Sequence, residues 1–149
     1  RHSVVVGAAY RAPSAPGGFR ISAISGAGGR PWGAAPLAWA ETEDPARPHL
    51  CAVGIAAAGA GGRSDRDVAV MDGTSQAAPQ VAGALALMMQ AVPAGKRLPA
   101  RALRAALVVA ARPLPAMIAD PAAAERAGAG LLDAAAAVAA ARAAAGAQA

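Results

Sequence analysis

The residue best suited to covalent chemistry in this sequence is Ser75, which follows Gly73 and Thr74 and opens an apolar stretch. The glycine permits a sharp turn, and the stretch predicts a helix over about residues 74–90, ahead of Pro93. A serine in the first helical turn lies beside backbone N–H groups that lack an intrahelical acceptor, at the favourable end of the helix dipole. The pattern is therefore compatible with an exposed nucleophilic hydroxyl whose own backbone N–H can stabilise an oxyanion.

A proline and several small residues support this interpretation of the turn. Pro79 lies just inside the predicted helix. Because it has no N–H, it removes the bond to the carbonyl of Ser75 and loosens the first turn. An alternative is that Thr74 or Ser75 is a helix N-cap, and for Ser75 taken alone the cap is the better explanation. Small residues would let the helix approach a sheet closely; they are Ala77, Ala78, Ala82 and Gly83.

The groups that would activate this serine are not evident in the sequence. A serine nucleophile needs a base within hydrogen-bond reach and a group that orients the base. His2 borders a predicted strand and His49 lies in a Pro-flanked loop, so we expect surface or loop histidines. Asp65 and Asp67 flank an arginine and indicate a solvated turn in preference to a metal site. Asp72, beside the glycine, indicates turn chemistry.

The single cysteine, Cys51, is a second candidate nucleophile, but the sequence supports it less well than Ser75. It allows no intrachain disulfide and no zinc-ligand spacing. It lies in the apolar run 50–54, which predicts a short buried strand. A catalytic thiol is the alternative, but a free cysteine in such a run is better explained as a small core residue.

The elements that would position these residues change from strands to helices along the chain. Apolar runs predict strands over residues 3–8, 19–25 and 50–55. A glycine-rich link through Gly62 follows the third run, and a short run at 67–71 leads into the serine turn. Strands followed by helices suggest a layered α/β fold with a largely parallel sheet.

The second half of the chain is predicted to be helical. After the helix that carries Ser75, another should start near Pro99 and end before Pro113. An extended connection through Pro113, Pro115 and Pro121 should follow. The last helix should start at Asp133, whose carboxylate can cap it, and should fray beyond Arg142, where almost nothing remains to bury.

Charge and hydropathy exclude two classes of function. The formal charge is +5, yet the positive residues are scattered and no aromatic side chains interleave with them. Arg97, Arg101 and Arg104 share a helical face opposite Leu103 and Leu107, which predicts the solvated side of an amphipathic helix and no nucleic-acid site. The longest apolar run contains a glutamine and is too short to span a bilayer.

The length and the first residue of the chain indicate a fragment of a domain. The 149 residues suffice for one modest domain. The chain begins at Arg1 without a signal peptide. We therefore interpret it as a piece of a longer protein, cut at the N-terminal side.

The segment from Gly73 to Gly83 resembles the serine-nucleophile motif of the subtilisin-like serine proteases, the subtilase family or peptidase S8. Nine of its eleven positions match, which is far more specific than a lone Gly-x-Ser. Other segments resemble, in the family's order, the strand after the oxyanion Asn, a Phe-Ser-x-x-Gly-like turn, a Lys-Pro-Asp-x-x-Ala-Pro-Gly segment, the following helix and the closing helix start. They are residues 4–8, 21–29, 47–54, 103–111 and 128–134, so nearly the whole chain is covered.

Four positions depart from the family's pattern. Gln76 replaces the usual Met after the nucleophile, which removes an oxidisable thioether. Gln80 replaces a His that is not the catalytic base, so activity need not suffer. Val53 replaces the usual Pro and His49 the usual Asp, and these changes affect the course of that loop.

The resemblance implies a partial subtilisin-like three-layer α/β fold, with a mainly parallel sheet and flanking helices, that lacks its N-terminal part. Residues 1–145 would be the C-terminal portion of the peptidase domain, and residues 146–149 a disordered tail. Ser75 would be the catalytic nucleophile, with Gly73 and Thr74 completing the oxyanion and nucleophile turn and Pro79 supporting the helix start.

The implied function is that of a serine endopeptidase that hydrolyses peptide bonds through an acyl-enzyme on Ser75. In this family the order is Asp, His, Ser, with an oxyanion Asn between His and Ser. These three partners should lie upstream of Arg1, so the fragment alone should be inactive. The alternative is a catalytically inactive subtilase-like binding or scaffold domain, for which the substitutions leave room.

The resemblance also implies partners and a compartment. The partners would be a polypeptide substrate and the upstream part of the same domain, with no nucleic acid and no membrane span. The residues indicate no metal and no certain cofactor, although structural calcium is frequent in the family. Localisation would be secreted or in the cell envelope.

Overall fold

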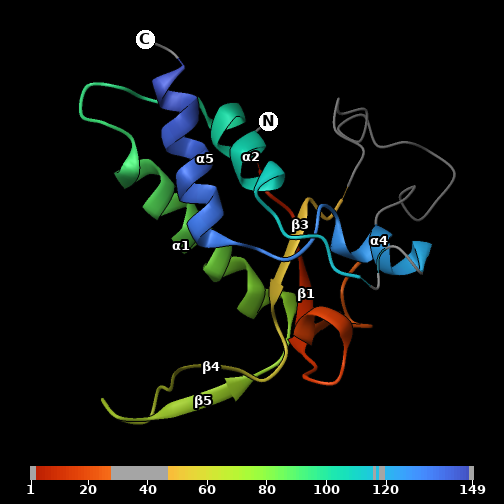
Figure 1. The fold of residues 1–149 in the computed structure, drawn as a ribbon. Helices are drawn as coiled ribbons and strands as arrows, with labels where there is room; N and C mark the ends of the chain where they lie inside the picture. Colours follow the sequence, from red (N-terminus) through yellow and green to blue (C-terminus); the bar gives the residue numbers. More distant parts are fainter. Residues whose placement is uncertain (1–2, 28–46, 116, 118–119, 148–149) are drawn as a thin grey trace, which may run out of the picture.

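The computed structural model describes residues 3–27, 47–115, 117 and 120–147. Along the described residues, short strands come before the α-helices, as Figure 1 shows. The strands are β1 (Val6–Arg11), β2 (Phe19–Ile21), β3 (Leu50–Val53), β4 (Ala57–Ala60) and β5 (Val68–Met71), and the helices are α1 (Thr74–Ala91), α2 (Ala100–Val109), α4 (Pro121–Ala127) and α5 (Ala134–Gly146).

A three-stranded sheet with the order β2-β1-β3 forms the centre of the molecule. β1 runs parallel to β3, with Val6 opposite Leu50 and Ala9 opposite Val53. β2 is antiparallel to β1, because a short turn joins the two strands and a parallel neighbour needs a long crossover. The predicted α/β class is confirmed. A mainly parallel sheet is not, since β1–β3 is the one parallel pair among the described strands.

Helices cover both faces of this sheet. Side chains alternate along a strand, so Leu50 and Ala52 of β3 join the larger apolar cluster, with α1, α2 and α5. Cys51 points the other way and joins Ala127 and Leu131 in a second cluster beside α4. Figure 1 shows α1, α2 and α5 on one side of β1 and β3 and α4 on the other. The arrangement has three layers.

Helix α1 carries the predicted nucleophile and is covered along one side only. Its buried residues recur at helical spacing, and the opposite side is also apolar, with Leu87 52% and Met89 60% exposed. A helix that is apolar all round is typically buried on every side, so this uncovered face is unusual. The buried residues are Ala77, Val81, Ala84 and Met88.

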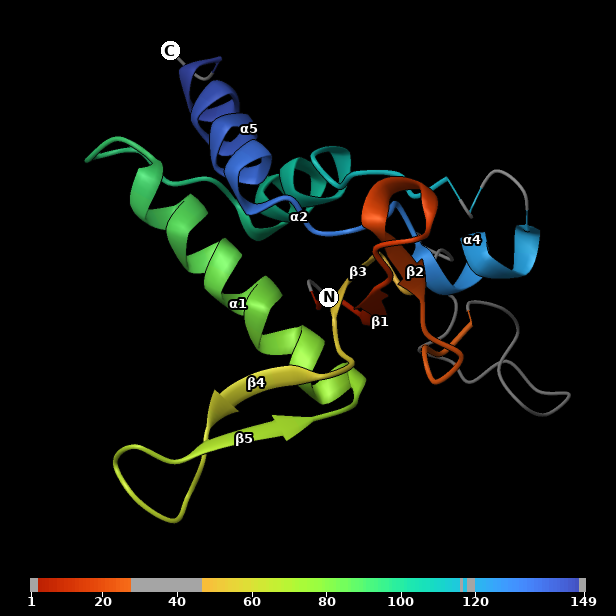
Figure 2. The same cartoon turned by 60° about the horizontal axis from the view of Figure 1, so that its bottom comes forward.

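Strands β4 and β5 pair as a hairpin separate from the main sheet. Figures 1 and 2 show it reaching away from the three-stranded sheet, beyond the start of α1. Val68 and Val70 are 64% and 65% exposed on it. The predicted run at 67–71 is thus confirmed as a strand, but the predicted glycine-rich link is wrong, because Ala57–Ala60 forms β4.

The predicted starts of α1, α2 and α5 are confirmed, whereas α4 replaces part of the predicted extended connection. α1 starts at Thr74, and Asp133 caps α5 through Oδ1, which accepts from the Ala136 N–H at 2.9 Å. Pro121 starts α4 and does not extend the connection, because Asp120 caps that helix. The predicted fraying of the last helix is also wrong.

The end of α5 is stabilised by packing. The helix continues to Gly146, and Ala141 and Ala145 are fully buried. Lys96 Nζ also donates to the carbonyl oxygen of Ala145 at 3.0 Å. Alanine can therefore bury enough surface here because α1 and α2 approach it closely. Of the proposed tail, residues 148 and 149 lie outside the described part of the chain.

Candidate active site

Ser75 is the second residue of α1 and is exposed. The N-cap of the helix is Gly73, with a φ of 149°, a value that favours glycine, and no side chain caps the helix. The interpretation of Thr74 or Ser75 as the N-cap is therefore wrong. Because the serine hydroxyl is not used as a cap, it remains available to an incoming group, beside N–H groups of the first helical turn.

The turn before Ser75 is hydrogen-bonded to the segment that follows β3. The N–H of Gly73 donates to the carbonyl of Gly54 at 2.6 Å. One side-chain contact reinforces this: the N–H of Ala56 donates to Asp72 Oδ1 at 2.7 Å. The prediction of turn chemistry for Asp72 is confirmed, and its role is to hold the start of the hairpin against the serine turn.

The side chain of Gln80 joins the first turns of α1 to the end of β3 through a hydrogen bond. Its Nε2 donates to the carbonyl of Val53 at 2.6 Å and to that of Gln76 at 3.1 Å. Pro79, confirmed inside the helix, precedes it. Sequence reasoning noted Gln80 only as a departure from the family's His. Its amide could have suggested this bridge, but not the partner, which lies 27 residues away.

Gln76 lies directly beside the nucleophile turn. Its Nε2 is 3.8 Å from the sulfur of Met71. Its Oε1 is buried and makes no hydrogen bond within the described residues. A buried carbonyl oxygen without a donor costs stability, so the glutamine is not the residue that packing alone would favour at this position.

The structure does not bring a described histidine to Ser75. His49 lies in the loop before β3, as expected, but it is buried and not a surface residue, and its Nδ1 accepts from the N–H of Val5 at 2.9 Å. It precedes β3, whereas Gly54, which holds the serine turn, follows that strand. Five residues of extended chain separate the two positions by roughly 16 Å. His49 therefore cannot act as the base for Ser75, and His2 lies outside the described residues.

The acids of the hairpin loop have a local role. Asp67 accepts hydrogen bonds from Arg63, which lower the pKa of its carboxyl below its ordinary value. Asp65 is exposed in the same loop. Within the described residues, no group of three or more His, Cys, Asp or Glu side chains could hold a metal ion. We therefore assign no calcium position and no step to a metal.

Cys51 is confirmed as a core residue in β3. It is fully buried, and its Sγ donates to the carbonyl of Gly130 at 3.3 Å. Burial raises the pKa of the thiol to about 12. Since the thiolate is the reactive form, the catalytic-thiol alternative has no support.

The described fold is α/β, and it presents Ser75 exposed on a glycine turn, at the start of a helix that is bound to the end of a strand. A sequence model of the subtilase family matches residues 35–130, which is more than half of the chain. The chain belongs to the subtilase family, a family of serine peptidases. A search among curated proteins finds no match. None of the helices in the described ranges is both long and apolar enough to cross a membrane.

Proposed function

We propose that this chain supplies the nucleophile of a subtilisin-like serine endopeptidase. The observation that carries the proposal is the position of Ser75, exposed at the second residue of α1 on a turn whose cap is a glycine. The turn is held from Gly54 and Ala56, so the hydroxyl has a fixed place on the surface. Preorganisation of this kind is what a nucleophile needs, and a merely capping serine would not require it.

In the reaction, the Ser75 hydroxyl oxygen attacks the scissile carbonyl carbon while a histidine takes its proton. The same histidine then protonates the departing amine, and water hydrolyses the acyl-enzyme. The Ser75 N–H donates to the oxyanion together with an asparagine side chain. We place the histidine, its orienting aspartate and the asparagine upstream of Arg1, because His49 is held elsewhere and the family order puts them there.

The uncovered side of α1 supports an upstream part of the same domain. Leu87 and Met89 are exposed there although the helix is apolar all round. On this proposal, that part covers the helix and brings the missing catalytic groups to Ser75. The isolated 149 residues should then hydrolyse no casein. Casein cleavage that is lost in Ser75→Ala would show that the described chain contains a base of its own.

The decisive experiment is labelling of the full-length protein with a fluorophosphonate. We expect modification at Ser75, located by peptide mapping, and its loss in Ser75→Ala. Ser64→Ala is the matched control, since it removes an exposed serine hydroxyl in the hairpin loop, away from the serine turn, and should keep the label. Labelling that survives in Ser75→Ala would refute the assignment. A protein that folds but takes up no label would instead favour the inactive scaffold. Secretion or attachment to the cell envelope belongs to the same proposal.

A further inference from the structure

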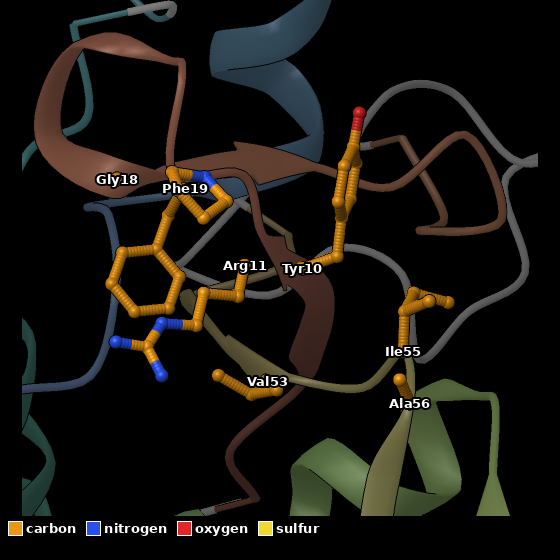
Figure 3. Close-up of a pocket in the computed structure, with 8 residues that line it drawn as sticks. Tyr10, Arg11, Gly18, Phe19, Val53, Ile55 and Ala56 are labelled. Carbon is orange, nitrogen blue, oxygen red and sulfur yellow. The ribbon is translucent and has the colours of Figure 1, made fainter.

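A pocket of about 660 Å³ opens where β1 and β3 end, and the proposed catalytic step does not use it. β1 ends at Arg11 and β3 ends at Val53. The two strands are parallel, so their carboxyl ends lie at one edge of the sheet. This is the edge at which α/β sheets commonly bind ligands. Figure 3 shows side chains from both strands and from β2 around the opening.

The lining combines apolar walls with a single positive charge. Tyr10, Ile55 and Ala56 stand at one end of the opening, as Figure 3 shows. At the other end, the guanidinium group of Arg11 lies beside Phe19 and Val53. Arg11 is the one charged residue among the described residues that line the pocket. An arginine fork is permanently charged and matches a carboxylate, so the lining fits an apolar group next to an acid.

A second arginine adds to the positive charge near this end. The guanidinium carbon of Arg112 lies 5.5 Å from the ring centroid of Phe19. The attraction between a cation and an aromatic face favours this position of the two side chains. The ligand's acidic group would therefore meet a locally positive field, in a chain whose formal charge is +5.

One wall of the pocket is the segment 53–56, which is also hydrogen-bonded to the serine turn. The carbonyl of Val53 accepts from Gln80 of α1. The next carbonyl, of Gly54, accepts from Gly73, and the N–H of Ala56 donates to Asp72. The side chains of this segment thus face the pocket while its backbone is bonded to the nucleophile turn. One wall of the pocket is therefore hydrogen-bonded to the residues that precede Ser75.

We infer that this pocket binds the polypeptide substrate through an apolar side chain that neighbours a carboxylate, as in a Leu-Glu pair. The inference rests on the proposed function, because it names the substrate sequence which that site would favour. Arg11 is then a specificity residue: it binds the acid, while Tyr10, Ile55 and Ala56 contact the apolar group. The adjacency of the pocket to the serine turn and the charge complementarity with Arg11 favour a polypeptide as the occupant.

The test measures binding separately from catalysis. Fluorescein-labelled peptides of Gly, Ala and Ser carry one Leu-Glu pair, moved along the peptide, and each has a Leu-Gln twin. Fluorescence anisotropy records their affinity for the full-length protein with Ser75→Ala. At one or two placements, we expect the Leu-Glu peptide to bind about 2–5-fold more tightly than its twin, the range typical of an exposed ion pair.

Variants assign this difference to the pocket. Arg11→Ala should abolish the preference for Glu, whereas Arg66→Ala, which removes an exposed charge at the far end of the hairpin, should keep it. Ile55→Ser should weaken both twins equally, because it removes apolar wall and no charge. The inference is overturned if the preference persists in Arg11→Ala, if no placement shows a preference, or if neither twin binds.

Fluorophosphonate labelling of the protein with Ser75 intact separates the two proposals. Label at Ser75 without any effect of Arg11 would refute the pocket alone. A preference that depends on Arg11, in a protein that takes up no label, would refute the endopeptidase and keep the pocket as a peptide-binding site.

Discussion

Gly54→Ala tests whether the contact between the end of β3 and the serine turn determines the reactivity of Ser75. Gly54 is buried, and its carbonyl accepts from the N–H of Gly73 at 2.6 Å. A Cβ on Gly54 would lie 2.6 Å from the carbonyl oxygen of Gly73 and 2.8 Å from the Cβ of Ala8. The nearest atom belongs to backbone, so no side chain can swing away to make room.

The size of the effect follows from these distances. The carbonyl of Gly73 must retreat by about 0.4–0.8 Å to restore a contact of 3.0–3.4 Å. Forcing one carbon into a packed site costs about 1–3 kcal/mol of unfolding free energy. The same shift is passed to Ser75, two residues on. A misplacement of about 1 Å at a reacting group can cost on the order of a hundredfold in rate, so we expect labelling to slow at least about tenfold.

The assay compares urea denaturation with the rate of fluorophosphonate labelling, both on the full-length protein. Gly59→Ala in β4 is the matched control, because its added Cβ meets no heavy atom within 4 Å. It should change neither quantity appreciably. The reasoning is refuted if Gly54→Ala folds with wild-type stability and labels at the wild-type rate. A loss of stability without slower labelling would show that the turn absorbs the shift before Ser75.

Three further predictions concern neighbouring residues. Gln80→Leu should lower the unfolding free energy by about 0.5–1.5 kcal/mol in urea denaturation, because it removes the bond to Val53; Gln90→Leu, at the far end of α1, should not. Gln76→Met should raise the unfolding free energy by about 1 kcal/mol, because it removes the buried Oε1 that has no donor. It should also make labelling of Ser75 sensitive to hydrogen peroxide, and unchanged labelling after peroxide would contradict this. Burial raises the pKa of Cys51 from 9.0 to about 12, so its contribution to stability is complete below about pH 9 and falls as the pH rises toward 12. Urea denaturation should give a lower unfolding free energy at about pH 10 than at about pH 8. Cys51→Ala should remove the part of this decrease that is due to the thiol.

The features that could be predicted from the sequence depend on local chemistry. Gly73 fixes the start of α1 through its backbone freedom, and Pro99, the N-cap residue of α2, marks the start of that helix. The carboxylate of Asp133 caps α5 within three residues of its own position. Each signal acts over a few residues, so each is readable without knowledge of the fold.

The features that were missed depend on partners far along the chain. The β4 sequence, Ala-Ala-Gly-Ala, has weak strand propensity, and it is extended because β5 pairs with it. His49 is buried because Val5, 44 residues away, donates to its ring. The end of α5 persists because α1 and α2 cover its alanines. No local pattern carries this information.

The candidate site combines both kinds of information. The glycine and the helix start that expose Ser75 are local and could be predicted. The place of the hydroxyl relative to the sheet is set by Gly54, Ala56 and Val53, which bond to Gly73, Asp72 and Gln80. These contacts join segments that are separate in sequence, and the same short segment forms a wall of the pocket beside Arg11. A group bound in that pocket would contact the segment whose backbone is bonded to the serine turn. Occupancy of the pocket and reactivity at Ser75 should therefore be coupled, so that a Leu-Glu peptide too short to reach Ser75 changes the labelling rate of the wild type and not that of Arg11→Ala.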